Sequence, residues 1–413
     1  MPKLILAYSG GLDTTTAITW LSEERGYEVV ALNINAGMSK DQDTLEERGI
    51  AAGASKVLVH DAREDFLRYF AFPALTAGAI YQSTYPLATA LARPLMAKLL
   101  VETAHNENAI AVAHGCTGKG NDQVRFDIGI QTLDPELRIV APTREESMSR
   151  EAEIDYLQNK GISIEWEPKG SFSIDENIWG RSCEAGILED PWVEPPDEAW
   201  EWTNSIDATP TDPEEIEITF EQGFPTKIGN VSLDPVSLVE QLNTLGGTYG
   251  IGRADHVEDR LIGIKSRELY EAPAAVLLHT AHKALESITL SRRQLRMKQY
   301  ISEEYAELIY DGHWFSRHHQ DLASYVISTQ RNVSGSVRLK LHRGTITITG
   351  RKSDESLYDY GLATYDRNDT FDQSSSIGFI DIWGLQTRVQ AKKQLLEKTD
   401  ILKIAHPPQE GAD

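Results

Sequence analysis

A serine, two glycines and a group of hydroxyl side chains follow the first apolar run of the chain, in the stretch AYSGGLDTTT at residues 7–16. The run Leu4–Tyr8 predicts a buried strand, and Thr14–Arg25 has the apolar spacing of a helix. Unpaired amides at the start of a helix attract anions, and glycines let the backbone approach a ligand closely. We therefore expect a phosphate or pyrophosphate site. The alternative is a tight turn in which Asp13 or Thr14 caps the helix.

The spacing of this turn excludes two common phosphate-binding motifs. A Walker loop requires G-x-x-x-x-G-K followed by Ser or Thr, and a dinucleotide loop requires G-x-G-x-x-G. Neither pattern occurs at residues 7–16. These two classes of phosphate loop are therefore excluded.

A second glycine-rich stretch, HGCTGKGNDQVRFD, runs from His114 to Asp127. It combines three glycines with the cations Lys119 and Arg125 and with amide and carboxylate side chains such as Asp122. Groups of both signs in one turn suit a zwitterion such as an amino acid. The alternative is a polar loop with solvated charges.

Strand and helix signals alternate through the first third of the chain, which favours βαβ units and a parallel sheet. Ligands of such sheets bind at the carboxyl ends of the strands, so both glycine-rich stretches are expected to face one crevice. The predicted strands are Leu4–Tyr8, Glu28–Ile34, Lys56–His60, Ala109–His114 and Arg138–Ala141, and the predicted helices are Thr14–Arg25, Asp41–Ala52, Arg63–Phe72 and Leu87–Asn106.

The pattern changes after about residue 165 to that of an α+β domain. The stretch 189–202 is acidic and rich in proline and tryptophan, which predicts an extended loop. Alternating runs at 215–231 and 336–350 predict strands, and the second has an Arg-Gly turn typical of a hairpin. Helices are predicted at Val236–Leu245, Ala274–Ser291 and Ser302–His313. We expect domains at 1–166 and 167–376, followed by a helical tail at 377–413.

The tail has Leu385 and Val389 among charged residues, in a helix-like pattern. A helix at the end of a chain has little core of its own to cover. Its apolar residues are expected to pack either on a partner subunit or on its own domain.

Composition bounds the class of protein. The 413 residues hold 40 Lys and Arg against 63 Asp and Glu, a formal net charge of −23, which disfavours nucleic acid as the main partner. The two cysteines, Cys116 and Cys183, cannot form a disulfide framework or a zinc motif. No signal segment and no membrane-length apolar run occurs, so we expect a cytoplasmic protein. The three histidines of HWFSRHHQ (313–320) lack metal-ligand spacing and predict a solvated face rather than a metal site.

The pattern S-G-G-x-D followed by Ser or Thr, after a first strand, is similar to the pyrophosphate loop of the ATP pyrophosphatase superfamily. Six segments together resemble the argininosuccinate synthase family, in its order: AYSGGLDT, ARPLMAK, AHGCTGKGNDQVRF, GILEDPW, GIGRADHVEDR and IGIKSRELYEAP. The resemblance extends from Leu4 to about Arg388. Chance agreement of six ordered segments is hard to credit.

The resemblance implies an adenine-nucleotide α-hydrolase-like domain with a parallel sheet, then an α+β synthetase domain and a C-terminal helix. It implies an enzyme of arginine biosynthesis that joins citrulline to aspartate with ATP and Mg²⁺. In such an enzyme the ureido oxygen of citrulline attacks the α-phosphorus, giving citrullyl-AMP and pyrophosphate. The aspartate amine then displaces AMP. A homotetramer is also implied, with neither nucleic acid nor membrane as a partner.

The resemblance also assigns site residues. The ATP set is Ala7, Tyr8, Ser9, Gly10, Gly11, Leu12, Asp13, Thr14, Thr15, Ile34 and Gly115; the aspartate set is Thr117, Asn121 and Asp122; the citrulline set is Tyr85, Asn121, Arg125, Ser173, Ser182, Glu258 and Tyr270. Asp13, Asp122 and Arg125 are the expected catalytic residues, and no metal ligand is assigned. The chain departs from the family pattern at Ile34, in INAGMSK, and at Ala90, where serine is common.

Two rival functions stay open at this point. A tRNA thiolase shares the pyrophosphate loop, but such an enzyme is expected to be basic and to carry paired cysteines. A non-catalytic nucleotide-binding protein could keep the fold, although the presence of Asp122, Arg125 and Glu258 disfavours it. Turnover of ATP that requires both amino acids would separate the synthase from both rivals.

Overall fold

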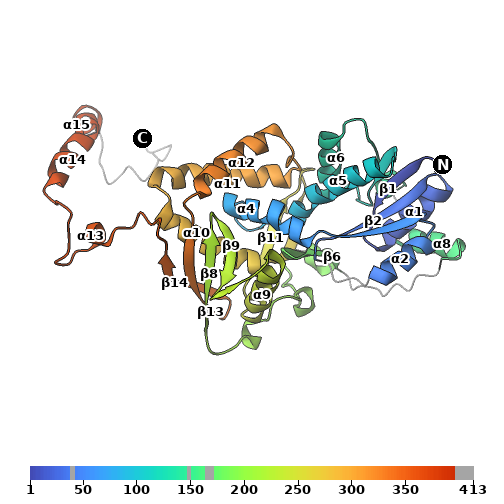
Figure 1. Cartoon of the computed structure of the whole chain (residues 1–413), viewed down its shortest axis with the longest axis horizontal. Helices are drawn as coiled ribbons and strands as arrows, with labels where there is room; N and C mark the ends of the chain where they lie inside the picture. Colours follow the sequence, from blue (N-terminus) through green and yellow to red (C-terminus); the bar gives the residue numbers. More distant parts are fainter. Residues whose placement is uncertain (38–41, 147–149, 163–171, 396–413) are drawn as a thin grey trace, which may run out of the picture. The chain divides into compact units, whose positions relative to one another are not determined.

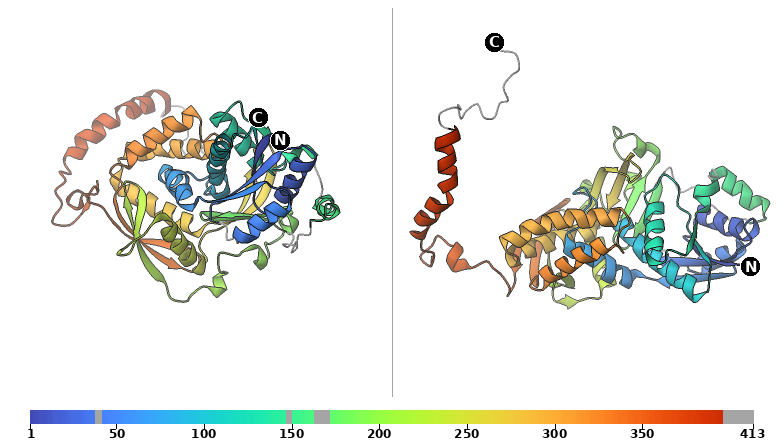
Figure 2. Two further views of the ribbon diagram at one scale, coloured as in Figure 1. Left: turned by 45° about the vertical axis from the view of Figure 1, so that its right-hand side comes forward. Right: turned by 90° about the horizontal axis from the view of Figure 1, so that it is seen from above.

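The computed structural model describes residues 1–37, 42–146, 150–162 and 172–395 (Figures 1 and 2). The chain divides into two compact units, Met1–Leu357 and Tyr358–Asp413, and each is described by itself. The domain boundaries expected at 166/167 and 376/377 stay predictions, and the first of them lies outside the described residues.

A five-stranded parallel sheet forms the N-terminal part of the first unit, as the alternating pattern predicts. Its strand order is β3-β2-β1-β4-β5, and every neighbouring pair is parallel. The strands are β1 (Lys3–Ala7), β2 (Glu28–Asn35), β3 (Lys56–Asp61), β4 (Ala111–Ala113) and β5 (Arg138–Val140). All five fall at the expected places.

Both faces of this sheet are covered, because successive residues of a strand point to opposite faces. Leu4 and Leu6 pack in one apolar cluster with residues of α1 (Leu12–Glu23), on the side where α2 (Gln42–Ala51) and α8 (Arg150–Asn159) also lie (Figure 1). Ile5 and Leu32 belong to a second cluster, which includes most of the buried side of α5 (Ala88–Asn106). That second cluster continues into the rest of the unit.

The strand order has a switch point between β1 and β4. The connection after β1 leads to β2 on one side, whereas β4 lies on the other side of β1. Loops diverge at such a point and leave a crevice at the carboxyl ends of the two strands. The glycine turn follows β1, and the stretch that begins at His114 follows β4 and leads into α6 (Asp122–Leu133).

Helical residues between β3 and α5 extend beyond the predicted Arg63–Phe72. The segment consists of α3 (Arg63–Phe66), a π-helical turn (Leu67–Ala71) and α4 (Phe72–Ala77), and Gly78 ends it with φ +72°. Pro73 lies in the first turn of α4, where its missing amide proton costs little. A short helix, α7 (Pro142–Glu146), follows β5.

A five-stranded antiparallel sheet follows in the second half of the unit, in the order β10-β9-β8-β13-β14. Arg343 and Gly344 join β13 to β14 with φ of +46° and +73°, the mirror-image turn that suits a two-residue hairpin. The strands are β8 (Glu214–Glu221), β9 (Phe224–Ile228), β10 (Val231–Ser232), β13 (Gly335–His342) and β14 (Thr345–Lys352); the helices are α9 (Pro235–Thr248), α10 (Pro273–Thr289), α11 (Arg292–Tyr310) and α12 (Arg317–Gln330).

Helices α11 and α12 correct two predictions. Helix α11 begins ten residues before the expected Ser302, at a capping box in which Ser291 and Gln294 bond to each other's backbone amides. The solvated face expected at 313–320 is wrong for His319, which is 5% exposed. Its ring packs at a tilt against those of Tyr305 and Trp314, because the first turn of α12 packs on α11.

A four-stranded antiparallel sheet, in the order β11-β12-β7-β6, completes the first unit. Its strands are β6 (Ser173–Asn177), β7 (Gly180–Glu184), β11 (Arg253–Asp259) and β12 (Lys265–Glu271). The sequence did not predict this sheet. Apolar and polar residues do not alternate along these strands, because one face of the sheet carries charged and hydroxyl side chains.

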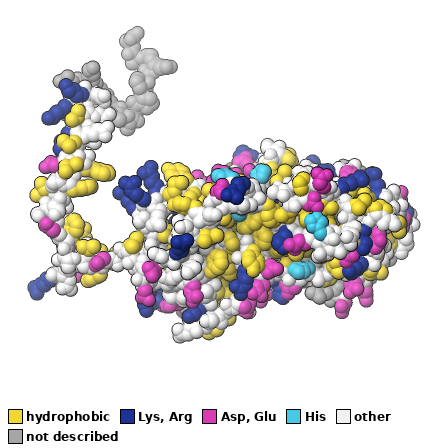
Figure 3. Space-filling model, turned by 45° about the horizontal axis from the view of Figure 1, so that its top comes forward, with side chains coloured by type: hydrophobic (Ala, Val, Ile, Leu, Met, Phe, Trp, Pro, Cys, Tyr) yellow, Lys and Arg dark blue, Asp and Glu magenta, His cyan; other side chains and the backbone are white. Residues whose placement is uncertain are grey.

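The second unit holds α13 (Tyr360–Ala363), α14 (Ser375–Trp383), α15 (Leu385–Gln390) and a π-helical turn (Ala391–Leu395). Hydrophobic side chains run along these helices in the space-filling view (Figure 3). Ile377, Phe379 and Trp383 are 69%, 59% and 76% exposed. Within the part of the chain that the structure describes, no helix is long and apolar enough to cross a membrane.

Candidate active site

The glycine turn has a geometry that only glycine adopts easily. Gly10 has φ +72°, and a Cβ atom built on it would lie 2.2 Å from Leu45 Cδ2. Arg48 Nη1 donates to the Gly10 carbonyl at 2.8 Å, which fixes the turn against α2. Gly11 occupies the N-cap position of α1 and no side chain caps the helix, so the alternative with Asp13 or Thr14 as the cap is wrong. The amides of the first turn therefore remain available to an anion.

Hydroxyl groups line the same turn. Ser9 Oγ accepts from the Gly11 amide at 3.2 Å and lies 3.1 Å from Thr14 Oγ1. Thr15 Oγ1 donates to the Gly11 carbonyl at 2.8 Å. These contacts hold the backbone in place and leave Asp13 exposed at the start of α1.

The second glycine-rich stretch lies against the first. A Cβ atom on Gly115 would be 3.0 Å from Thr14 Cγ2, so the loops after β1 and β4 are in contact. His114 anchors the second loop, because its Nδ1 accepts from the Cys116 amide at 3.2 Å and its Nε2 lies 2.8 Å from Asp127 Oδ1. Thr117, which directly follows Cys116, is exposed. The contact brings the helix that begins at Asp122 close to the glycine turn.

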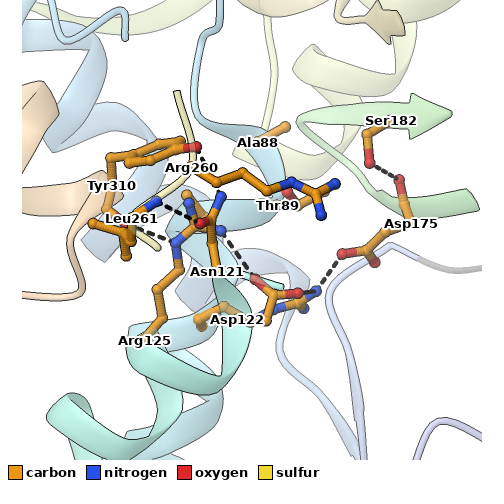
Figure 4. Close-up of polar contacts among 12 residues, drawn as sticks. Ala88, Thr89, Asn121, Asp122, Arg125, Asp175, Ser182, Arg260, Leu261 and Tyr310 are labelled. Carbon is orange, nitrogen blue, oxygen red and sulfur yellow. Dashed lines mark hydrogen bonds and ion pairs between the residues drawn. The ribbon is translucent and has the colours of Figure 1, made fainter. Parts of the chain in front are cut away.

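Asp122 forms ion pairs with two arginines (Figure 4). Its Oδ2 lies 2.7 Å from Arg93 Nη2, and its Oδ1 lies 2.9 Å from Arg125 Nη1. Arg93 also contacts Asp175 on β6. Burial opposes ionisation of Asp122, but the charges of Arg93 and Arg125 outweigh burial and lower its pKa to about 2. Burial and the charge of Asp122 raise the pKa of Asp175.

Arg125 keeps one donor nitrogen without a partner. The residue is 4% exposed, and its Nε donates to the Tyr310 carbonyl at 2.8 Å. Its Nη2 is buried and has no hydrogen-bond partner among the described residues. A buried guanidinium nitrogen without an acceptor is costly, so this atom points to a ligand that brings an acceptor. Its forked geometry suits a carboxylate.

Glu258 is buried, contacts the same Tyr310 as this arginine, and receives several donors. Tyr310 Oη donates to its Oε1 at 2.7 Å, and Tyr270 Oη donates to its Oε2 at 2.5 Å. Asn121 links the group, because its Nδ2 lies 2.7 Å from Tyr310 Oη and its Oδ1 accepts from the Leu261 amide at 3.0 Å. Tyr310 therefore links the buried carboxylate of Glu258 to the buried guanidinium of Arg125.

Two pairs of stacked tyrosines enclose the carboxylate. Tyr85 and Tyr270 have ring centroids 4.0 Å apart, and Tyr81 and Tyr310 have centroids 3.7 Å apart. The Tyr85 hydroxyl accepts from the Thr89 amide at 3.0 Å, at the start of α5. Burial raises the pKa of Tyr85. These rings exclude water and strengthen the electrostatic interactions between them.

The four-stranded sheet supplies the remaining predicted citrulline residues on one face. Ser182 lies directly opposite Tyr270 on one side and Asp175 on the other, and Ser173 lies opposite Glu184. Residues two apart in a strand share a face, so the predicted Ser173, Ser182 and Tyr270 point the same way. Ser182 Oγ donates to the Asp175 carbonyl at 3.3 Å, whereas Ser173 is exposed.

The remaining predicted ATP residue lies at the end of β2. The register pairs Ala7 with Leu32, so Ile34 extends beyond the end of β1 on the side of the glycine turn. Its side chain is 7% exposed, and any contact with a nucleotide base would come from its backbone.

Several residues of the site were missed by the sequence reasoning. Arg93, Asp175, Arg260, Glu268 and Tyr310 all take part in the hydrogen bonds and ion pairs around Asp122 and Glu258. Arg93 lies in a predicted core helix directly before a proline, and a charged residue there was a usable signal. Nothing near Tyr310 marked it, because its partners are more than fifty residues away in sequence.

Comparison with known proteins identifies the family. The model described as "Arginosuccinate synthase N-terminal HUP domain" matches residues 3–163, and that described as "Arginosuccinate synthase C-terminal domain" matches residues 172–390. The chain belongs to the argininosuccinate synthase family. The fold of a HUP domain followed by antiparallel sheets and a C-terminal helix agrees with the predicted fold class.

Full-length relatives carry the same name. An argininosuccinate synthase of Dehalococcoides mccartyi is 52% identical over 392 residues, covering 95% of this chain and 97% of the relative. Those of a Geobacillus species and Symbiobacterium thermophilum are 52% and 50% identical, covering 94% and 95% of this chain and 96% and 98% of theirs. The solved U34-tRNA thiolase NcsA of Methanococcus maripaludis covers 41% of this chain and 60% of its own, with a TM-score of 0.26 and 12% identity. That value is too low to bear on function.

Proposed function

We propose that the chain condenses citrulline with aspartate in an ATP-dependent reaction, through citrullyl-AMP, and releases AMP and pyrophosphate. Membership of the argininosuccinate synthase family supports the overall condensation. The observation that carries the site assignment is the buried Nη2 of Arg125, which has no hydrogen-bond partner among the described residues, together with the buried carboxylate of Glu258, which contacts the same Tyr310. An α-amino acid has one group for each of them.

Citrulline is placed with its α-carboxylate on Arg125 and its α-ammonium on Glu258. A carboxylate would satisfy the free donor of Arg125 with a charge-assisted hydrogen bond. The ammonium would join the hydroxyl donors that already surround Glu258. Tyr85, Asn121, Ser173, Ser182 and Tyr270 complete the proposed citrulline set. The ureido group then extends toward the glycine turn, which Gly115 contacts.

ATP is placed with its phosphates on the amides and hydroxyls of residues 9–15. Backbone amides at a helix start stabilise the charge that develops on departing pyrophosphate, without reorganisation. The proposed contacts are Ala7, Tyr8, Ser9, Gly10, Gly11, Leu12, Asp13, Thr14, Thr15, Ile34 and Gly115. Mg²⁺ fits a nucleotide-bound role, since the described residues include no group of three or more His, Cys, Asp or Glu side chains arranged to hold a metal. Asp13, exposed at the start of α1, is the carboxylate that would hold such an ion beside the phosphates, and the ion would supply positive charge to them.

Aspartate is placed on Thr117, Asn121 and Asp122. The ureido oxygen of citrulline attacks the α-phosphorus and pyrophosphate leaves; the aspartate nitrogen then attacks the ureido carbon and AMP leaves. The nitrogen must lose a proton in this second step. Asp122 is a poor acceptor because its pKa is about 2, so we assign the proton to a phosphate oxygen. Catalysis then depends mainly on positioning and charge stabilisation.

Isotope transfer tests this proposal. Citrulline labelled with ¹⁸O in its ureido group is incubated with ATP, aspartate and the enzyme, and AMP is analysed by mass spectrometry. We expect one ¹⁸O per AMP and pyrophosphate release that requires citrulline. Unlabelled AMP would exclude citrullyl-AMP. Nucleotide binding without turnover would instead support a regulatory protein.

We also propose that the chain forms a homotetramer through its tail. The exposed apolar side chains of α14 and α15 form a surface that water solvates poorly, and a second copy of the chain would cover it. The family resemblance supports four copies.

A further inference from the structure

The hydroxyl of Tyr270 lies between two carboxylates. Its oxygen is 2.5 Å from Glu258 Oε2 and 3.0 Å from Glu268 Oε2. A phenol has one proton, so it donates to only one of them. The other carboxylate oxygen is then at hydrogen-bond distance from an oxygen lone pair, and that contact is favourable only if the carboxyl group itself carries a proton.

Glu268 is the group that must carry this proton. Both oxygens of Glu258 already accept hydroxyl donors, from Tyr310 and Tyr270. Among the described residues, Glu268 contacts Tyr270 and Arg260, whose Nη2 is 3.2 Å away. Its side chain is 12% exposed, so only a small part of the carboxyl group is open to water.

The charges around Glu268 favour the same protonation state. Glu258 on β11 and Glu184 on β7 face it, and His256 lies directly opposite in the sheet register. Arg260 is a cation in contact with Glu268, and the same Arg260 also contacts Glu184. Burial first, and then the charges of Glu258 and Glu184, raise the pKa of Glu268 to about 8.

We propose that Glu268 holds a proton in the citrulline-free enzyme and releases it when the α-ammonium of citrulline binds at Glu258. The inference rests on the proposed function, in which Glu258 receives the ammonium. Two ionised carboxylates, Glu258 and Glu268, can then lie close together because the ammonium supplies the positive charge that the proton supplied before. The proton leaves Glu268 for solvent. Glu268 is thus a positioning residue, which keeps the pocket close to neutral before and after binding and favours ligands that carry an ammonium.

The coupling has a defined sign. Because the free enzyme binds one proton more than the complex, citrulline binds more tightly as pH rises toward 8. At pH 7 a group with a pKa of about 8 is about 90% protonated, so about 0.9 proton is released per citrulline bound. The dissociation constant falls up to about tenfold per pH unit between pH 6 and 8 and then becomes constant.

Calorimetry in buffers of different ionisation enthalpy measures this release. Citrulline is titrated at pH 7 into the full-length enzyme saturated with α,β-methylene-ATP, which resists cleavage between these phosphates. Glu268→Gln keeps the shape of the protonated group, and we expect it to bind citrulline with no proton release above about 0.1 and no pH dependence between 6 and 8. Glu184→Gln is the matched control, since it also removes a carboxylate from Arg260 but leaves Tyr270 untouched. It is expected to retain more than half of the release.

The outcomes separate the two proposals. Equal proton release in wild type and Glu268→Gln, or none in wild type, overturns the role of Glu268 while citrulline binding stands. No citrulline binding to wild type overturns the proposed function and this inference together. Should Glu268→Gln fail to fold, infrared difference spectra of the wild type decide. Loss of the carbonyl band of one protonated carboxyl on citrulline binding supports the inference, and an unchanged band refutes it.

Discussion

Replacement of Arg125 by lysine tests the assignment that carries the proposed function. The native guanidinium donates from Nη1 to Asp122 and from Nε to the Tyr310 carbonyl, and its Nη2 has no partner among the described residues. Lysine keeps the positive charge, but its single nitrogen cannot reach three acceptors arranged around a planar fork. We expect it to keep the contact with Asp122, because that carboxylate would otherwise lie buried beside Arg93 alone. The substrate carboxylate then loses its partner.

The magnitude follows from the lost hydrogen bond. A hydrogen bond to a charged group contributes about 1.5–3 kcal/mol, so the KM for citrulline should rise about 10- to 150-fold. The lost bond to the Tyr310 carbonyl should lower the free energy of unfolding by about 1 kcal/mol. The KM for ATP should change less than about threefold, since the glycine turn is unaltered.

Steady-state pyrophosphate release gives the KM for citrulline when citrulline is varied with ATP and aspartate saturating, and the KM for ATP when ATP is varied with citrulline and aspartate saturating. Urea unfolding gives the stability. Arg144→Lys is the control, because Arg144 also pairs with an aspartate of α6, Asp127, at 2.8 Å. It should change the citrulline KM less than about threefold. A citrulline KM within twofold of wild type in a stably folded Arg125→Lys enzyme would refute the assignment.

Three further predictions concern other parts of the chain. Gly10→Ala places a Cβ at φ +72° and 2.2 Å from Leu45 Cδ2. Urea unfolding should therefore show a free energy of unfolding lower by about 2 to 4 kcal/mol, and the KM for ATP should rise. An unchanged midpoint of urea unfolding would contradict this prediction. Burial lowers the pKa of His319 to about 4, so the folded protein loses stability as pH falls from 6.5 toward 4. Between pH 7 and 5, the free energy of unfolding of His319→Phe should fall by about 2 kcal/mol less than that of wild type. Parallel pH profiles of the two proteins would refute this prediction. Truncation after Leu357 should convert the proposed tetramer to smaller species in sedimentation velocity, and a truncated chain that still sediments as the same oligomer as the full-length chain would count against the tail as the interface.

The parallel sheet was predictable because local signals and burial agree there. Strands buried on both faces read as continuous apolar runs, as in Leu4–Tyr8, and glycines or helical patterns mark their ends. The hairpin at 336–350 was predictable for a similar reason, since one face is buried and its turn needs residues that tolerate positive φ.

The four-stranded sheet was not predictable from periodicity. Its strands place Ser182, Glu258 and Tyr270 on a polar face that a substrate would cover, so the usual alternation of apolar and polar residues is absent. The polar residues that the site requires therefore remove the sequence pattern by which these strands would be predicted. Motif resemblance pointed to these residues, whereas propensity did not.

The contacts within the site also divide into those that local sequence spacing predicts and those that it does not. Asp122 and Arg125 lie together on one helical turn, and their spacing predicts a shared face. The meeting of Glu258 with Tyr310 depends on how a sheet packs on α11, which no local pattern encodes. Arg93 was visible only as a charge in an apolar helix.

The sharing of one carboxylate by Arg93 and Arg125 restricts how these positions can diverge. Loss of either guanidinium leaves Asp122 with half of its compensation in a buried place, and loss of Asp122 leaves two cations facing each other. No single exchange to an uncharged residue at the three positions keeps the charges balanced. Helices α5 and α6 should therefore accumulate changes freely on their outer sides, while this trio stays fixed or is replaced as a set.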